Sequence, residues 1–247
     1  MGHYRAAVES VPPSEVPPVA ARPRTLVLLV TGGAIEAAML GPTGSELGAR
    51  VHTTHDPAVP LAPTLQALWP ALEPLGAFDR IAVGLGAGLA ETWTPAGLVA
   101  VLEDQSGRRA RAVTTAALQG APLIERAGVE MVLVLDATLE SALFLDGIPV
   151  PGLDLGRLRT RKRRTYAEYL ALRVATRKGA RAWSRRVRRA VDDILGAFGP
   201  RVLYLVGPGA ALLEADLELP PTVVVVRDAA PLAGAIALWS PAVPPPG

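Results

Sequence analysis

The sequence predicts an α/β protein made of two similar lobes. Short buried strands alternate with helices along the chain, and a run of three short strands opens each half. With 247 residues, of which 50% are hydrophobic, the chain has enough apolar surface for one large or two small cores. Its ends are rich in proline instead, so we expect flexible or polyproline-like tails at 1–24 and 241–247.

A three-stranded meander is expected at the start of the folded part. Short apolar segments separated by glycine-containing turns predict strands at 26–30, 37–40 and 49–53. Helix and strand then alternate, with a helix expected at 63–72, a strand at 80–84, a helix at 95–102 and a strand at 111–115. We therefore assign residues 25–115 to an N-terminal lobe.

The second half repeats this pattern. A short helix at 118–126 leads into a second meander, with strands at 130–135 and 141–145. Apolar periodicity then predicts helices at 165–177 and 181–198, strands at 202–206 and 222–226, and a closing helix at 231–239. Residues 116–229 are expected to form a C-terminal lobe, with the helix in 230–240 packing back on the first lobe.

The composition excludes several classes of site. The chain has no cysteine, which rules out disulfides, a thiol nucleophile and a cysteine-bound metal. No apolar run reaches the length of a membrane-spanning helix, and the N-terminus lacks the apolar stretch of a secretory signal, so we expect a cytoplasmic protein without membrane contact. His52, His55 and Asp56 are one ligand short of a metal site, and we expect no metal there.

Charge is unevenly distributed, although the net charge is only +2. Between Arg157 and Arg189 lie 14 of the 25 basic residues and one acid, Glu168, which gives this segment about +13 and the remainder about −11. The candidate anion-binding residues are Arg161, Lys162, Arg163, Arg164, Arg185, Arg186 and Arg189. Either the segment pairs with acids of the same chain or of another subunit, or it binds a polyanion such as polyphosphate, nucleic acid or an acidic protein.

Three stretches carry a resemblance to a known family. Residues 141–158 (SALFLDGIPVPGLDLGRL) match a strand, a turn, a short proline-bearing strand and a motif of the form E-L-G-H. Residues 205–209 are similar to the motif V-x-G-G-G, and residues 230–236 to A-G-x-x-G-A-A. On these grounds the chain resembles the polyphosphate glucokinases of the ROK family of sugar kinases. The resemblance implies the actin-like, ribonuclease-H-type two-lobe fold.

The phosphate-binding loops implied by this resemblance are altered. The family motif D-x-G-G-[ST] falls on 29–33, where there is no carboxylate, and the motif G-T-G-[IL]-G falls on 136–140, where glycines are replaced and two acids are present. Loss of glycine limits the approach of the backbone to a phosphate, and carboxylates repel it. The remnants of the loops are Thr31, Gly32, Gly33, Asp136, Thr138, Gly207 and Gly209.

The catalytic and sugar-binding positions implied by the resemblance are altered as well. The family motif N-D-A-D, which holds the general base, falls on 116–119 and places Ala117 at the position of the base. A methyl group cannot accept a proton. Asp154 and Arg157 occupy the positions of the sugar-contacting Glu and His in E-L-G-H, and are the candidate sugar site.

The resemblance therefore implies a catalytically degenerate homologue, a pseudokinase with a binding or regulatory role. A weak or altered sugar kinase, or an arginine-rich polyanion-binding protein, is the alternative. No cofactor is expected; Mg²⁺ with ATP or polyphosphate would be needed only if kinase activity is retained. We expect a homo-oligomer or a partner protein. Repressors of the family carry a winged-helix domain before the kinase-like part, and 24 proline-rich residues cannot form one, so sequence-specific DNA binding is not expected.

Overall fold

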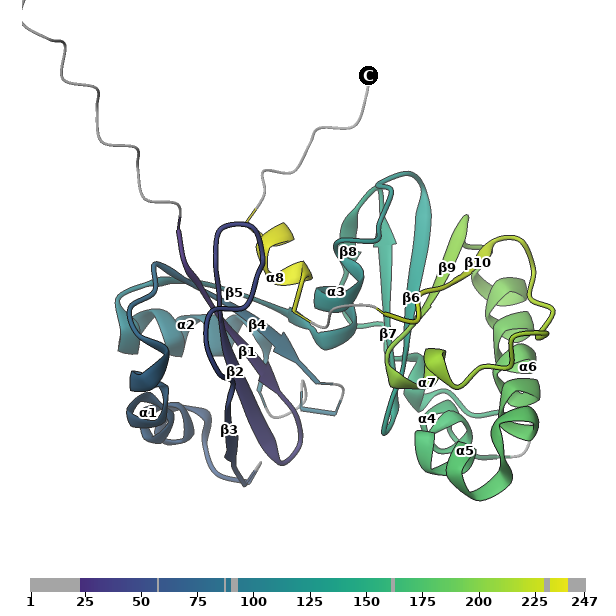
Figure 1. Cartoon of the computed structure of the whole chain (residues 1–247), viewed down its shortest axis with the longest axis horizontal. Helices are drawn as coiled ribbons and strands as arrows, with labels where there is room; N and C mark the ends of the chain where they lie inside the picture. Colours follow the sequence, from purple (N-terminus) through teal and green to yellow (C-terminus); the bar gives the residue numbers. More distant parts are fainter. Residues whose placement is uncertain are drawn as a thin grey trace, which may run out of the picture.

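The computed structural model describes residues 23–56, 58–86, 88–89, 93–160, 163–228 and 232–239. The predicted C-terminal tail and nearly all of the predicted N-terminal tail lie outside these residues. So do Arg161 and Lys162, two of the candidate anion-binding residues. Figure 1 shows the two lobes side by side, with the N-terminal half in purple and blue and the C-terminal half in teal, green and yellow.

The N-terminal lobe is built on a five-stranded sheet with the order β3-β2-β1-β4-β5. Its strands are β1 (Thr25–Val30), β2 (Ala34–Leu40), β3 (Val51–Thr54), β4 (Arg80–Leu85) and β5 (Arg109–Thr114). The central strand β1 is antiparallel to β2 and parallel to β4, and all its residues are buried. A continuous apolar run such as TLVLLV is typical of a strand covered on both faces.

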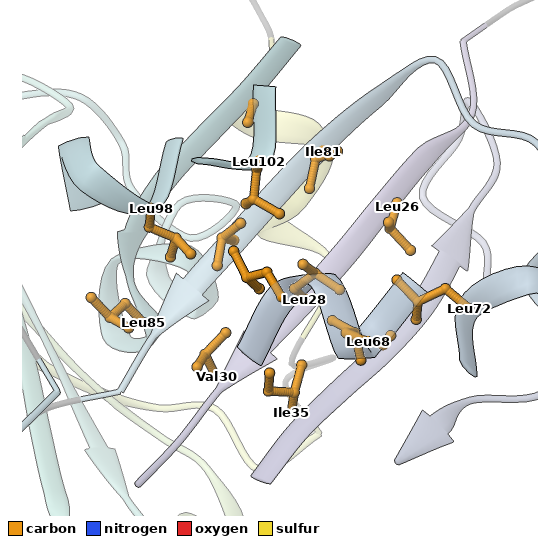
Figure 2. Packing of buried hydrophobic residues seen from close by; sticks show 14 of the residues in the cluster. Leu26, Leu28, Val30, Ile35, Leu68, Leu72, Ile81, Leu85, Leu98 and Leu102 are labelled. Atoms are coloured by element: carbon orange, nitrogen blue, oxygen red, sulfur yellow. The ribbon is translucent and has the colours of Figure 1, made fainter. Parts of the chain in front are cut away.

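The outer face of this sheet is covered by α1 (Leu61–Leu72), which the short 3-10 turn η1 (Glu73–Leu75) extends, and by α2 (Pro95–Ser106) (Figure 1). Figure 2 shows Leu68 of α1 and Leu102 of α2 among the leucines and isoleucines of β1, β2 and β4. The bounds of α2 have local causes. Thr94 caps its start by accepting a hydrogen bond from the Gly97 amide, and Gly107 ends it in the left-handed conformation at φ 64°.

The C-terminal lobe repeats the same topology around β6. Its sheet has the order β10-β9-β6-β7-β8, and β6 is antiparallel to β7 and parallel to β9, as β1 is to β2 and β4. The strands are β6 (Val129–Leu135), β7 (Leu139–Leu145), β8 (Ile148–Val150), β9 (Val202–Val206) and β10 (Val223–Val225). The prediction of two similar α/β lobes is confirmed.

Helices α4 (Tyr166–Leu170), α5 (Leu172–Lys178) and α6 (Ala180–Phe198) cover the outer face of the second sheet (Figure 1). Two shorter turns, η2 (Leu155–Arg157) and α7 (Pro208–Ala211), follow β8 and β9. The helix predicted at 165–177 is interrupted at Ala171, whose ψ of 139° is extended; the next amide, that of Leu172, donates to the Asp136 carbonyl at 3.0 Å. No helix in the described part of the chain is both long and apolar enough to cross a membrane.

Two short helices lie between the sheets, α3 (Thr115–Gly120) and α8 (Gly234–Ala237) (Figure 1). Every residue of α3 is buried. Leu118 packs in a cluster with Val27 and Leu29 of the first sheet, while Ala116 and Ala117 pack in a cluster with β6, β7 and β9 of the second. One helix of six residues therefore contributes to the cores of both lobes.

The helix predicted at 118–126 begins and ends earlier than expected. A buried carboxylate, that of Glu130, accepts hydrogen bonds from the amides of Glu125, Arg126 and Ala127 at 2.9, 2.8 and 3.3 Å. These bonds hold the segment before β6 as a loop, because the amides they use are not available to a helix. Burial and the neighbouring Glu130 also raise the pKa of Tyr204 above its usual value.

The closing helix is shorter than predicted, covering four residues of the expected 231–239. Its end is held by Trp239, whose ring lies between two guanidinium groups, Arg80 at 5.1 Å and Arg111 at 4.7 Å from its centroid. Helix α8 thus packs on the N-terminal lobe although it follows the C-terminal lobe in the sequence (Figure 1).

Gly234 provides a test of the packing between α8 and α3. A Cβ at this position would lie 1.6 Å from the Leu118 carbonyl oxygen. We expect Gly234→Ala to lower the free energy of unfolding by about 1 to 3 kcal/mol or more, because the backbones would have to separate. Urea denaturation of the purified protein measures this change.

The matched control is Gly196→Ala on the exposed side of α6, where an added Cβ meets nothing within 4 Å. This variant should be neutral or stabilise by up to about 1 kcal/mol, since alanine restricts the unfolded chain and favours helix. Equal effects of the two substitutions would contradict the close packing described for α8.

Candidate functional site: two cavities between the lobes

Two cavities lie side by side where the two lobes meet. The first, of about 590 Å³, is lined by the β1–β2 hairpin and by the loops that follow β6 and β9; we call it the loop cavity. The second, of about 630 Å³, is lined by β5, the start of α3, β7 and the segment from β8 to η2; we call it the proline cavity. Gly86 and Glu140 line both.

The structure brings most of the predicted phosphate-loop residues together. Thr31, Gly32, Asp136, Thr138 and Gly207 all line the loop cavity, although they come from three distant parts of the sequence. Gly33 and Gly209 do not line it. The strands that carry these loops are the central ones of each sheet and their neighbour β9, so the loops meet at one edge.

The first hairpin has an apolar side chain where the resemblance implies an acidic one. Leu29, at that position, lines the loop cavity. The Thr31 amide and hydroxyl both donate to the Ala34 carbonyl, at 2.8 and 3.0 Å, so they close the hairpin. Gly32 and Gly33 have open space where a side chain would be.

The loop after β6 carries its own anion. The Asp136 carboxylate accepts a hydrogen bond from the Ala137 amide at 2.7 Å. That amide is a backbone donor which would otherwise be available to a phosphate oxygen. The loop is therefore occupied by a carboxylate of the chain itself, and its charge opposes a second anion.

The two guanidinium groups that line the loop cavity already have partners. Arg50 forms ion pairs with Glu36 and Glu46, and the hydrogen bonds that its guanidinium donates to both carboxylates raise its pKa; the bond to Glu46 lowers the pKa of that acid. Arg227 donates through Nη1 to the carbonyls at the end of α7, at 3.1 to 3.2 Å. Both cations are thus engaged in holding the structure rather than directed at a ligand.

The proline cavity contains the candidate sugar-site residues. Asp154 and Arg157 both line it, and their Oδ2 and Nε atoms are 3.2 Å apart. Asp154 also caps η2 by accepting a hydrogen bond from the Gly156 amide at 3.0 Å. Ala117, at the position of the expected base, lines the same cavity and is 4% exposed.

Glu140 lies at the boundary between the cavities. It projects from β7 of the C-terminal lobe, and its Oε1 atom is 3.4 Å from the point where a Cβ on Gly86 of the N-terminal lobe would be. The carboxylate therefore reaches across to the other lobe, between the loop that resembles a phosphate site and the pocket that resembles a sugar site.

Comparison with solved structures identifies the architecture. A polyphosphate/ATP-glucomannokinase from Arthrobacter sp. strain KM superposes with a TM-score of 0.68 at 21% identity, covering 88% of this chain and 100% of that one. A ROK family glucokinase from Streptomyces griseus, in complex with glucose and AMPPNP, has a TM-score of 0.64 at 13% identity, covering 87% and 97%. The chain has the fold of the ROK-family sugar kinases.

A ROK family transcriptional regulator, a homologue of the E. coli MLC protein, has the same fold with a TM-score of 0.56 at 13% identity, covering 87% of this chain and 78% of that one. No family model and no curated protein matches the sequence. The resemblance stated from three short stretches is thus confirmed at the level of the ROK fold, as is the actin-like two-lobe architecture.

Several residues of the site were not predicted from the sequence. Glu36 and Arg50 reach the loop cavity from β2 and the segment before β3, and Arg227 reaches it from beyond β10. They belong to no local motif, and only the pairing of strands in the ROK fold brings them there. Glu140 differs, because its position in the altered G-T-G-[IL]-G stretch was a signal that could have found it.

His55 has structural partners. His52 lines the loop cavity, whereas His55 bonds through Nε2 to the Thr31 carbonyl at 2.7 Å and stacks on Trp93 at 4.9 Å. Among the described residues, no group of three or more His, Asp or Glu side chains is arranged to hold a metal ion.

Helices α5 and α6, which carry most of the described cations of the basic segment, lie on the outer side of the C-terminal lobe (Figure 1). Of the candidate anion-binding residues, Arg163, Arg164, Arg185 and Arg189 are exposed. Arg186 is only partly exposed, because its guanidinium lies over the ring of Tyr169 at 4.8 Å from the centroid.

The structural need for glycine can be tested separately at Gly209, after β9, and at Gly33 in the β1–β2 hairpin. A Cβ on Gly209 would lie 2.7 Å from Leu135 Cβ and 2.8 Å from Trp183 Cη2. We expect Gly209→Ala to destabilise the protein by about 1 to 3 kcal/mol, because these neighbours are buried. Gly33→Ala, in open space, should change stability by less than about 0.5 kcal/mol in the same urea assay. A neutral Gly209→Ala would show that packing does not require this glycine.

Proposed function

We propose that the protein is a catalytically degenerate homologue of polyphosphate glucokinase and the ROK sugar kinases, a pseudokinase that acts by binding. The observation that carries the proposal is the position of Glu140, which lies between the loop cavity and the proline cavity and lines both. The neighbouring Ala117 adds to it, since its methyl group stands where the resemblance implies the general base.

A kinase of this architecture needs a phosphoryl donor in one cavity and an acceptor hydroxyl in the other, with an open line between them. Here that line passes the Glu140 carboxylate, which repels a phosphoryl group through its charge. The acceptor hydroxyl would also find no base at Ala117 to take its proton. Both features oppose the same step independently.

The loop cavity does not fit the phosphates of Mg²⁺-bound ATP or polyphosphate. Its Ala137 amide is bonded to Asp136, and its two arginines are engaged with Glu36, Glu46 and the end of α7. The donors that usually cradle a phosphate are thus already satisfied. A fold neighbour described as a transcriptional regulator supports a binding role, since the ROK fold also occurs outside kinases.

We expect no phosphorylation of glucose above background with ATP or with polyphosphate. Loss of a general base alone costs about 10² to 10⁴ in rate, and the obstructed line adds to this. A coupled assay with each donor, at enzyme concentrations high enough to detect slow turnover, measures it. A turnover of about 1 per second or faster would support the alternative, a weak or altered sugar kinase.

A pair of substitutions tests whether the missing base alone accounts for the expected loss of kinase activity. Ala116→Asn with Ala117→Asp should leave activity at background, because Glu140 and Asp136 remain and catalytic groups act as a unit. Adding Glu140→Gly to this pair removes the carboxylate between the cavities. Robust activity from the first pair alone would contradict the role proposed for Glu140.

A second candidate function, polyanion binding, is favoured by a separate observation. In the described part of the chain, most cations of the basic segment have no acidic partner. We call the exposed ones the basic surface: Arg159, Arg163, Arg164, Arg173, Arg177, Lys178, Arg181, Arg185 and Arg189. The exceptions, Arg157 and Arg188, pair with the nearby Asp154 and Asp192.

The acidic remainder of the chain therefore does not neutralise the basic surface within the described residues. Arg181, Arg185 and Arg189 follow one another at intervals of four along the exposed side of α6, so like charges stand next to each other. A chain of closely spaced phosphates would relieve this repulsion and release counterions.

We expect retention on polyphosphate or heparin to fall steeply with salt. Replacing Arg181, Arg185 and Arg189 by Gln should weaken binding and reduce the salt slope by roughly one unit for each lost contact. The matched control replaces Arg24, Arg108 and Arg109, three exposed arginines of the N-terminal lobe, and should keep most of the slope.

Sedimentation of the same variants tests the competing explanation. If the basic surface instead pairs with acids of another subunit, the α6 triple variant will shift toward monomer at low salt, and neither protein will bind polyanions. A monomeric wild type that never binds a polyanion would refute both explanations.

A further inference from the structure

We propose that the proline cavity binds an uncharged, predominantly apolar small molecule instead of a sugar. The inference rests on the proposed loss of phosphoryl transfer and deepens it, because it names the chemical class that the remaining pocket fits. It is carried by three properties of the cavity: a hydrocarbon wall, polar side chains already bonded to the protein, and an excess of negative charge.

The wall of the cavity is formed largely by hydrocarbon. Three prolines line it, Pro95 at the start of α2, Pro149 in β8 and Pro151 directly after β8, together with Val113, Val150 and Leu153. Proline has no amide hydrogen, so these three positions present ring carbons and cannot donate a hydrogen bond. Ala117 contributes a further methyl group to the wall.

The polar side chains of the wall serve the protein itself. Thr114 accepts from the Ala117 amide at 3.2 Å as the cap of α3, and Ser141 accepts from the Leu155 amide at 3.0 Å. Asp154 holds the Gly156 amide and Arg157, as described above. These bonds fix the segments that shape the cavity.

A hexose would be poorly matched to such a pocket. Sugar hydroxyls point outward around the ring, and each one that leaves water without gaining a partner opposes binding. Selective sugar recognition requires several polar groups directed at those hydroxyls, whereas Thr114, Ser141 and Asp154 accept hydrogen bonds from backbone amides and Arg157 pairs with Asp154. An apolar ligand gives up no hydrogen bonds to water when it enters the cavity, and burial of its surface favours binding.

The charge of the wall and the volume of the cavity restrict the class of ligand further. The carboxylates of Glu140 and Asp154 outnumber the single guanidinium of Arg157 in the wall, so an anion would be repelled. The volume of about 630 Å³ lies within the range of pockets that enclose a small organic molecule. At the mouth, Val150 is 40% exposed and would be covered by the ligand.

N-Phenyl-1-naphthylamine, an uncharged aromatic dye whose emission rises in apolar surroundings, tests the proposal with the full chain. We expect saturable binding of one dye per chain, and a loss of affinity of about tenfold or more in Val150→Asp, because a charge then faces the apolar ligand. Pro151→Asp, a second substitution at an exposed position, should act in the same direction.

The matched control is Val224→Asp. Val224 is 41% exposed on β10, the opposite edge strand of the same sheet, so the two valines differ chiefly in their distance from the cavity. Its dye affinity should equal that of the wild type. No saturable binding, or equal weakening by Val150→Asp and Val224→Asp, would overturn the assignment of the cavity.

Glucose provides the opposing test. Calorimetry should detect no glucose binding, and glucose should not displace the dye; displacement at millimolar concentration would overturn the proposal. Phosphoryl transfer is measured separately, so failure of the pseudokinase proposal can be distinguished from failure of the apolar-ligand proposal. A protein that turns over glucose refutes the pseudokinase proposal, whereas an inactive protein that binds neither dye nor glucose refutes only the apolar site.

Discussion

The burial of α3 between the two sheets is the constraint on which the arrangement depends. Its six residues are all buried, and glycines allow the close approach on both sides: a Cβ on Gly120 would meet Val132 at 2.5 Å, and one on Gly234 would meet the Leu118 carbonyl. Because both sheets pack on this helix, their strand ends face each other and the two cavities form where they meet. Ala117 suits this helix, since a small side chain satisfies the packing without supplying chemistry.

Carboxylates around the cavities hold backbone amides instead of ligands. Asp136 binds the Ala137 amide, and Asp154 binds the Gly156 amide; at the start of β6, Glu130, which lines neither cavity, likewise binds three amides of the preceding loop. Such bonds stabilise a loop in one conformation, and they occupy donors that an anion would need. These loops can therefore stay ordered although the catalytic residues implied by the resemblance are replaced.

Charge differs between the two surfaces for which we propose a binding role. The cavities are lined by more acids than arginines, whereas the exposed cations of α5 and α6 lie on the outer side of the C-terminal lobe, away from the first sheet (Figure 1). A small apolar ligand between the lobes and a polyanion on the outer surface would not compete for the same groups. Binding at one need not disturb the other, because no described residue of the basic surface lines either cavity.

The sequence by itself determined the repeated strand order and the resemblance that placed Ala117, Asp154 and the altered loops, because alternation, turns and short motifs are local properties. Most of the predicted phosphate-loop residues also line the loop cavity. Only the tertiary structure decided that Glu140 reaches Gly86 across the lobes, that Arg50 and Arg227 are engaged, and that α3 stops at Gly120. The approach of Glu140 to Gly86 joins residues far apart in the chain, and the bonds of Arg50, Arg227 and Glu130 depend on how the chain folds around them, so no local pattern encodes these outcomes.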